Sequence, residues 1–182
     1  MIGEETLRYV ESKATHFEGI HPRPSIDVLL RTAQQHHVQL SVMADTKASI
    51  LITVSSIVMT IALSRSSDPQ LRPALLTLAI ACLVSLMLAI IAVLPTFSKR
   101  GQVRNILFFG HFASMTEDEF MKALENVISS DEKIYEAAAR DLYSLGTYLH
   151  RKKYRYLRLA YIALLSGFVL AMLVESWVII QY

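Results

Sequence analysis

The chain has 182 residues, of which 53% are hydrophobic, and its mean hydropathy of +0.37 is too high for an ordinary soluble domain. This composition indicates membrane spans, because a soluble bundle of this size could hardly bury such long apolar runs. The net charge of +2 excludes the basic footprint of a nucleic-acid-binding protein. The single cysteine, Cys82, excludes an intrachain disulfide framework and a cysteine metal cluster.

We expect residues 1–24 to form an N-terminal helix and a linker, followed by one membrane domain over residues 25–182. Ser25 is a candidate N-cap, and no Gly or Pro interrupts the chain from there to Ser67. The pattern predicts one helix of about 40 residues, whose uncharged second half predicts a first span at about 47–65. Its apolar stripe, at steps of four and three, consists of Ile26, Leu30, Ala33, His37, Leu40 and Ala44.

Two further uncharged runs follow, and they predict spans at about 73–97 and 156–178. The segment between them, 98–155, is polar and is expected to be helical. Thr116 and Glu119 form a capping box that predicts a short helix to about Ile128. Ser129 and Glu132 predict a second capping box and a long helix that enters the bilayer without a break. The apolar face of that helix consists of Ile134, Ala138, Leu142, Leu145, Leu149 and Tyr156.

Lys and Arg residues are concentrated before the first span and between the second and third spans, whereas the first loop holds only Arg65 and Arg72. This bias predicts that the N-terminus and segment 98–155 are cytoplasmic and that the C-terminus lies outside. The sequence therefore predicts an all-α membrane protein. Three transmembrane helices are expected, with long helices extending into a cytoplasmic helical bundle.

Each predicted span carries an edge of small residues. The first edge is hydroxylated and consists of Ser49, Thr53, Ser56, Thr60 and Ser64; the other two consist of Ala81, Ser85 and Ala89, and of Ala160, Ala163, Gly167 and Ala171. Close packing of helices is one explanation. The other is that the hydroxylated edge lines a path for ions or water. One chain with three spans cannot enclose a pore, so a conduit requires a homo-oligomer.

No motif of a hydrolase, a metalloprotease or a phosphate-binding loop is present, and we expect neither enzymatic activity nor a cofactor. Asp45 and Lys47 stand at the boundary of the first span. Lys47 is expected to extend toward lipid headgroups, whereas Asp45 is either paired with a cation from another helix or poised to respond to one. The basic and aromatic cluster His150 to Arg158 predicts an interfacial anchor.

Three blocks of the sequence resemble the landmark blocks of the Pycsar transmembrane effectors, in the same order. They are "ADTKASILI" (44–52), "NILFFGHF" (105–112) followed by "TEDEF", and "ARDLYSLGTYLHRKKYRYLRLAY" (139–161), and the resemblance covers roughly residues 26–173. It implies a bacterial antiphage effector in the inner membrane. A partner pyrimidine cyclase would make cCMP or cUMP, and the effector would respond by impairing the membrane and aborting the infection.

A cyclic nucleotide needs a cation for its phosphate, an aromatic face for its base and an amide or carboxylate for the base edge. The candidate ligand contacts are Arg104, Asn105, Phe108, Phe109 and His111, completed by Arg140, Asp141 and Tyr143. An alternative for the three phenylalanines 108, 109 and 112 is that they plug the base of the helical bundle. The alternative functions are a ligand-independent pore-forming protein and a membrane scaffold.

Overall fold

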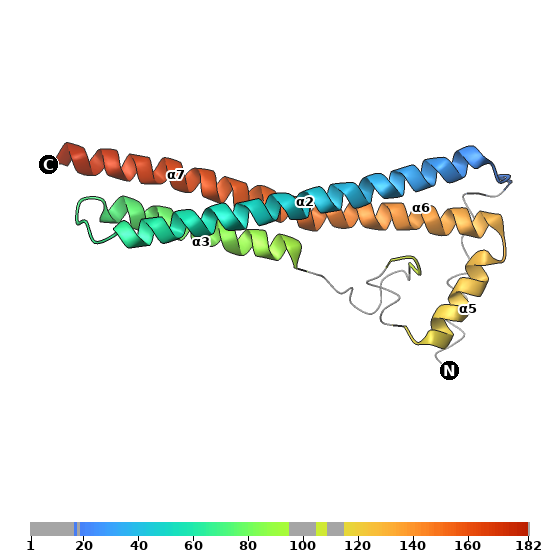
Figure 1. Cartoon of the computed structure of the whole chain (residues 1–182). Coiled ribbons are helices and arrows are strands. Elements are labelled where there is room, and N and C mark those ends of the chain that lie inside the picture. Colours follow the sequence, from blue (N-terminus) through green and yellow to red (C-terminus); the bar gives the residue numbers. More distant parts are fainter. Residues whose placement is uncertain (1–16, 18, 95–104, 109–114, 182) are drawn as a thin grey trace. The chain divides into compact units, whose positions relative to one another are not determined.

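The computed structural model of the chain describes residues 17, 19–94, 105–108 and 115–181, and within these ranges all regular structure is helical (Figure 1). The elements are α2 (Pro24–Arg65), α3 (Arg72–Val93), α5 (Glu117–Ile128), α6 (Asp131–Tyr148), the π-helix η1 (Leu149–Tyr154) and α7 (Arg155–Gln181). This architecture confirms the predicted all-α class. Most of residues 1–24, where an N-terminal helix was expected, lies outside the described residues.

The chain divides into two compact units. Unit 1 consists of Met1–His37 and Thr96–Gly146, and unit 2 consists of Val38–Pro95 and Thr147–Tyr182. Helices α2 and α6 contribute residues to both units. Unit 2 contains the apolar segments predicted as spans, whereas unit 1 contains α5 and most of the polar candidate residues.

Helix α2 agrees with the helix of about 40 residues predicted from Ser25. Its 42 residues correspond to a length of about 63 Å at 1.5 Å per residue, twice the roughly 30 Å of a hydrocarbon core. The predicted apolar stripe is the protected side of the helix, because Leu30, Ala33 and His37 are half-buried and Ala44 is buried. About half of the length of α2 is therefore sufficient to cross a bilayer, and the other half extends beyond it.

Three helical stretches are long and apolar enough to cross a membrane, and they agree with the three predicted spans. They are α2, α3 and the continuous helical run from α6 through η1 to α7. Pro73, in the first turn of α3, fits a position where the missing N–H has no helical partner. Helix α3 ends at Val93, and the remainder of the span predicted to residue 97 lies beyond the described part after residue 94.

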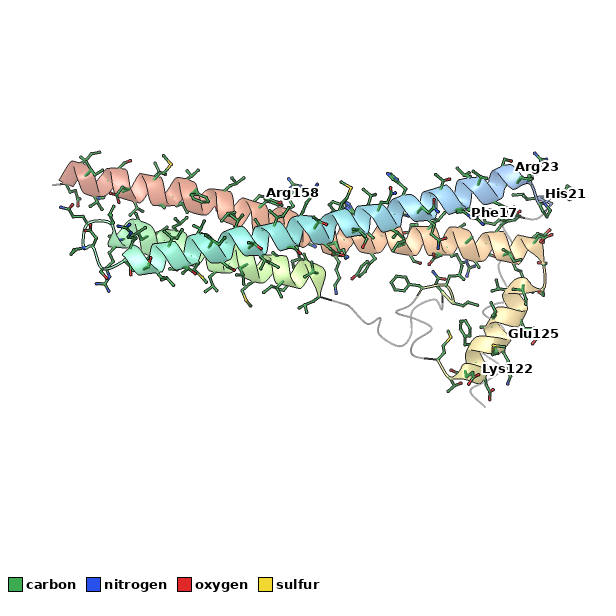
Figure 2. All side chains as sticks on the ribbon, in the orientation of Figure 1. Phe17, His21, Arg23, Lys122, Glu125 and Arg158 are labelled. Atoms are coloured by element: carbon green, nitrogen blue, oxygen red, sulfur yellow. The ribbon has the colours of Figure 1, made fainter. Side chains whose placement is uncertain are left out.

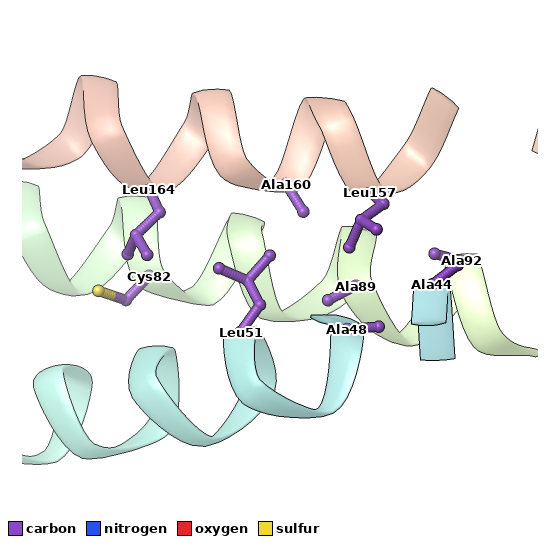
Figure 3. Close-up of a cluster of buried hydrophobic side chains, with 9 residues drawn as sticks. All are labelled: Ala44, Ala48, Leu51, Cys82, Ala89, Ala92, Leu157, Ala160 and Leu164. Atoms are coloured by element: carbon purple, nitrogen blue, oxygen red, sulfur yellow. The ribbon is translucent and has the colours of Figure 1, made fainter. Parts of the chain in front are cut away.

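The core of unit 2 lies between α2, α3 and α7, which face one another through small and branched apolar side chains (Figure 3). Its buried members are Ala44, Ala48 and Leu51 from α2, Cys82, Ala89 and Ala92 from α3, and Leu157, Ala160 and Leu164 from α7. Five alanines among nine residues permit close approach of the helix backbones. In lipid, such packing replaces the hydrophobic force that holds soluble helices together.

Contacts between α3 and α7 confirm close packing as the role of the second and third small-residue edges. A Cβ added to Gly167 would lie 2.2 Å from the Cβ of Ala81, so only glycine fits there. The fully buried Ser85 hydroxyl donates a hydrogen bond to the carbonyl of Ala160 at 2.8 Å, and Ser55 of α2 donates to Ser85 at 3.4 Å. These polar contacts join all three helices inside the apolar core.

The capping predictions have different outcomes. Thr116 and Glu119 form the predicted capping box at the start of α5. The predicted box of Ser129 and Glu132 is wrong, because Ser129 has the helical backbone angles of the C-cap of α5, whereas an N-cap requires extended ones. The Ser130 hydroxyl instead accepts a hydrogen bond from the backbone N–H of Lys133 at 3.4 Å. Helix α6 therefore begins one residue later than the box implied.

The second long helix is continuous from Asp131 to Gln181, which confirms the prediction of a helix that enters the bilayer without a break. Residues Leu149–Tyr154 form a π-helix between α6 and α7. In a π-helix each backbone hydrogen bond spans one residue more than in an α-helix, which turns the residues that follow about the helix axis. Tyr156, the last residue of the predicted apolar face, is half-buried against the core of unit 2.

Candidate functional site

Unit 1 contains a cavity of about 330 Å³ between residues of α2 and α6. This volume is at the lower end of the range typical of small-ligand pockets. The apolar part of its wall comes from the faces predicted for the two helices, with one residue from the segment after Asn105. The lining residues are Asp27, Leu30, Arg31, Gln34, Leu107, Ile134, Tyr135, Ala138 and Leu142.

The polar lining combines a cation, a carboxylate, an amide and an aromatic ring. The Tyr135 hydroxyl donates to Oδ1 of Asp27 at 3.2 Å. Burial, followed by that hydrogen bond, raises the pKa of Tyr135 above its ordinary value, so the phenol stays protonated and acts as the donor. The structure gives the Arg31 guanidinium no ion pair or hydrogen bond with any described residue, and Arg31 is exposed. It is therefore available to an anion.

A buried carboxylate lies beside this cavity. Asp141 is 4% exposed, and its two oxygens accept hydrogen bonds from Nδ2 of Asn105 at 3.1 Å and from Nε2 of Gln34 at 3.0 Å. Asn105 in turn accepts the backbone N–H of Leu107 on its Oδ1 at 3.0 Å. This network fastens the turn that carries Leu107 to α6 and fixes Gln34, which also lines the cavity. Two amide donors offset the desolvation of the carboxylate.

The structure brings together two of the eight predicted ligand contacts, Asn105 and Asp141, through that hydrogen bond. Phe108 is half-buried at the end of the same turn. Arg140 forms an ion pair with Glu136 one turn earlier on α6, and Tyr143 is 74% exposed. Neither Arg140 nor Tyr143 lines the cavity. Arg104, Phe109 and His111 lie outside the described residues.

The sequence analysis missed Asp27, Arg31, Gln34 and Tyr135 as candidate contacts. The first three recur at steps of four and three along α2, parallel to the apolar stripe, so they form a second stripe on an adjoining side of the helix. That spacing was the available signal. Tyr135 directly follows Ile134 in the predicted apolar face of α6, and its burial was not evident from the pattern.

A second polar cluster lies in unit 2, at the start of the first predicted span. Nζ of Lys153, on the π-helix, donates to both carboxylate oxygens of Asp45 at 2.7 Å and to the Ser41 hydroxyl at 2.9 Å. The Lys153 side chain is only 11% exposed, whereas that of Asp45 is 45% exposed. The interpretation of Asp45 as paired with a cation from another helix is thus confirmed.

The rest of the predicted boundary residues have different surroundings. Lys47 is exposed, as expected for a side chain that extends toward headgroups. The Tyr154 hydroxyl contacts α2, because it donates a hydrogen bond to the backbone carbonyl of Leu40 at 3.2 Å. Arg158 is exposed on α7 (Figure 2). The predicted interfacial anchor therefore also holds α2 through Lys153 and Tyr154.

The hydroxylated edge of α2 does not face α3 or α7. The buried residues of that part of the helix are Ala48, Leu51, Ser55 and Ala62, whereas the edge residues Ser49, Thr53, Thr60 and Ser64 are exposed and Ser56 is half-buried. Each edge hydroxyl donates to a carbonyl three or four residues earlier on its own helix. Packing against the described residues of the same chain therefore does not explain this edge.

Among the described residues, no group of His, Cys, Asp and Glu could hold a metal ion. The site and the fold define a class: an all-helical membrane protein with three spanning helices and a polar-lined cavity in a separate unit. The chain matches the model of the Pycsar effector protein domain over residues 28–180 and belongs to that family. It is an antiphage membrane effector. Comparisons with curated proteins and with solved structures found no match.

Proposed function

We propose that this effector senses a cyclic pyrimidine mononucleotide, cCMP or cUMP, in the cavity of unit 1 and responds by impairing the bacterial inner membrane. The observation that carries the proposal is a cation, Arg31, that has no partner among the described residues and lines a cavity with an aromatic and an amide side chain. A guanidinium can bind the cyclic phosphate, and Tyr135 and the leucines offer apolar surface to the base. The family implies that a partner cyclase supplies the signal.

The segment before and after Asn105 belongs to the same proposal. Leu107 lines the cavity, and Asp141 holds its turn in place through Asn105. Arg104, Phe109 and His111 are neighbours in sequence and remain proposed contacts, together with Phe108. Arg140 and Tyr143 remain proposed contacts only for a ligand that extends beyond the cavity, since neither lines it.

The uneven distribution of Lys and Arg supports an orientation in which the N-terminus and segment 98–155 are cytoplasmic and the C-terminus lies outside. A cyclic nucleotide made inside the cell would then reach unit 1 directly.

The oligomeric state is also part of the proposal. The hydroxylated edge of α2 is proposed as a contact between copies or as the lining of a conduit, and what supports this is that most of its residues are exposed in the described part of the chain.

Transmission of the signal is proposed to use α2 itself. This helix carries Asp27, Arg31 and Gln34 of the cavity and, without interruption, Asp45 and the first span. A ligand that binds two arrangements of the helices with different affinity shifts their equilibrium, and only such a difference can do so. A coupling of about 1–3 kcal/mol is typical and corresponds to about 5- to 150-fold shifts.

Growth of cells that express the effector with an inducible pyrimidine cyclase tests the proposal. Wild type should stop growth when the cyclase is induced. Arg31→Ala should restore growth, because the phosphate loses its cation. The matched control is Lys122→Ala, which removes an exposed cation of α5 outside the cavity (Figure 2) and should arrest growth like wild type.

Two outcomes would contradict the proposal. Growth arrest without any cyclase would indicate a ligand-independent pore. Full arrest by Arg31→Ala, at equal protein level in the membrane, would place the ligand elsewhere than in this cavity.

A further inference from the structure

The residues around Asp141 determine which atoms of the cavity wall can accept a hydrogen bond from a ligand, and these acceptors discriminate between ligands. Asn105 accepts the backbone N–H of Leu107 on its Oδ1, so its amide nitrogen is the atom that faces Asp141. A backbone N–H can only donate, so the Asn105 atom that faces Leu107 must be the amide oxygen, although the oxygen and nitrogen of an amide have nearly the same shape. The first oxygen of Asp141 is therefore an acceptor.

The second oxygen of Asp141 fixes Gln34 in the same way. The side chain of Asp141 offers only oxygens to its neighbours, and both oxygens accept amide N–H groups in the structure. Gln34 must then direct its nitrogen toward Asp141. Its carbonyl oxygen is the end of the amide that is left for a ligand, and Gln34 lines the cavity.

Asp27 adds a second acceptor. Its Oδ1 accepts a hydrogen bond from the Tyr135 hydroxyl, so that hydroxyl is not free to donate to a ligand. Its other oxygen has no hydrogen-bond partner among the described residues. Among the described residues of the wall, the side-chain groups left for a ligand are thus two acceptors, on Asp27 and Gln34, and one cation, Arg31.

We infer that the cavity takes an anionic ligand whose ring carries an amino group, because the anion meets Arg31 and the ring edge meets the acceptors of Gln34 and Asp27. This inference rests on the proposed function and chooses between its two ligands. Cytosine presents an amino group at ring position 4, which donates two hydrogen bonds, whereas uracil presents a carbonyl oxygen there. Uracil has one donor at this edge, the N3–H beside that carbonyl, so it can satisfy at most one of the two acceptors, whereas the amino group of cytosine can donate to both. The preferred ligand is therefore cCMP.

Calorimetric titration of the full-length protein in detergent with cCMP and with cUMP tests the inference. The expected result is that cCMP binds roughly tenfold or more tightly, as for a site that loses one or two hydrogen bonds with the wrong ring. Equal binding, or tighter binding of cUMP, would overturn the inference and leave the proposed function intact. Binding of neither nucleotide would overturn both.

Asp141→Asn provides a second measurement that a merely structural role would not affect in the same way. The introduced amide keeps one acceptor for Asn105 and directs its own donor toward Gln34, so Gln34 can rotate and present its nitrogen to the ligand. The ratio of the two affinities should shift toward cUMP by roughly tenfold. Asp131→Asn is the matched control, because it is the same change on an exposed residue of α6 outside the cavity, and it should leave the ratio unchanged. An unchanged ratio in folded Asp141→Asn protein would overturn the inference.

Discussion

The sequence indicated that Asp45 could pair with a cation, but it did not indicate which cation. Its place beside an apolar run indicated an unusual carboxylate, and the two interpretations were a cation from another helix or readiness to respond to one. The identity of the cation was not predictable, because the π-helix alters which of the four neighbouring basic residues faces α2. Lys153 is that residue. Residue chemistry was thus predictable and residue pairing was not.

Removal of the Asp45 carboxylate should destabilise the protein, because it leaves the nearly buried ammonium of Lys153 with the Ser41 hydroxyl alone. We expect Asp45→Ala to lower the free energy of unfolding by about 1–3 kcal/mol. Lys47→Ala, at an exposed position, should change it by less than about 0.5 kcal/mol. Denaturant titration in detergent measures both. Equal effects of the two variants would argue against the ion pair as a stabilising contact.

Among the elements, the best-predicted were those with a long uninterrupted pattern. Helix α2 begins one residue before Ser25 and has 42 residues, close to the expected length of about 40, and the capping box of α5 is confirmed. The π-helix was not predictable, since hydrophobic periodicity does not distinguish it from an α-helix over six residues. The cavity was partly predictable: Asn105 and Asp141 were both candidate ligand contacts and are hydrogen-bonded to each other, whereas Asp27, Arg31 and Gln34 lie off the predicted apolar stripe of α2 and were not among the candidates.

The contact between α3 and α7 predicts the effect of one added methyl group. Gly167→Ala should lower the free energy of unfolding by about 1–3 kcal/mol, because the new Cβ overlaps that of Ala81 and the two helices must separate. Ala81→Gly in the same protein should recover most of the loss. Gly146→Ala is the control, since its Cβ would lie 3.4 Å from the His37 ring, an ordinary contact. Stability equal to wild type in Gly167→Ala would contradict the close packing of these helices.

The continuity of α2 predicts a separation of binding from response. Val38→Gly combined with Gln39→Gly softens the helix at two exposed positions without changing its register. Nucleotide affinity should change less than about threefold, while growth arrest after cyclase induction should be weakened. Val38→Ala combined with Gln39→Ala keeps the helix stiff and should behave as wild type. Full toxicity of the glycine variant would exclude α2 as the transmitting element.

At the scale of the whole molecule, the fold class and the number of spans followed from composition and from the length of the apolar runs. Orientation is a separate prediction from the distribution of Lys and Arg. A reporter that is active only outside the cytoplasm should give a signal when fused after Tyr182 and no signal when inserted after Ser114. The opposite pattern would place unit 1 outside the cell, where a cyclic nucleotide made within it would not reach the cavity.

The central claim is that a ligand in unit 1 changes the membrane, and permeability of dye-loaded liposomes that contain the purified effector tests it most directly. Nucleotide added on the side of unit 1 should release the dye from liposomes with wild-type protein. Liposomes with Arg31→Ala should retain the dye at the same nucleotide concentration, because the cavity has lost its only lining cation among the described residues. Equal dye release with and without nucleotide, or equal release by Arg31→Ala and wild type, would contradict the account.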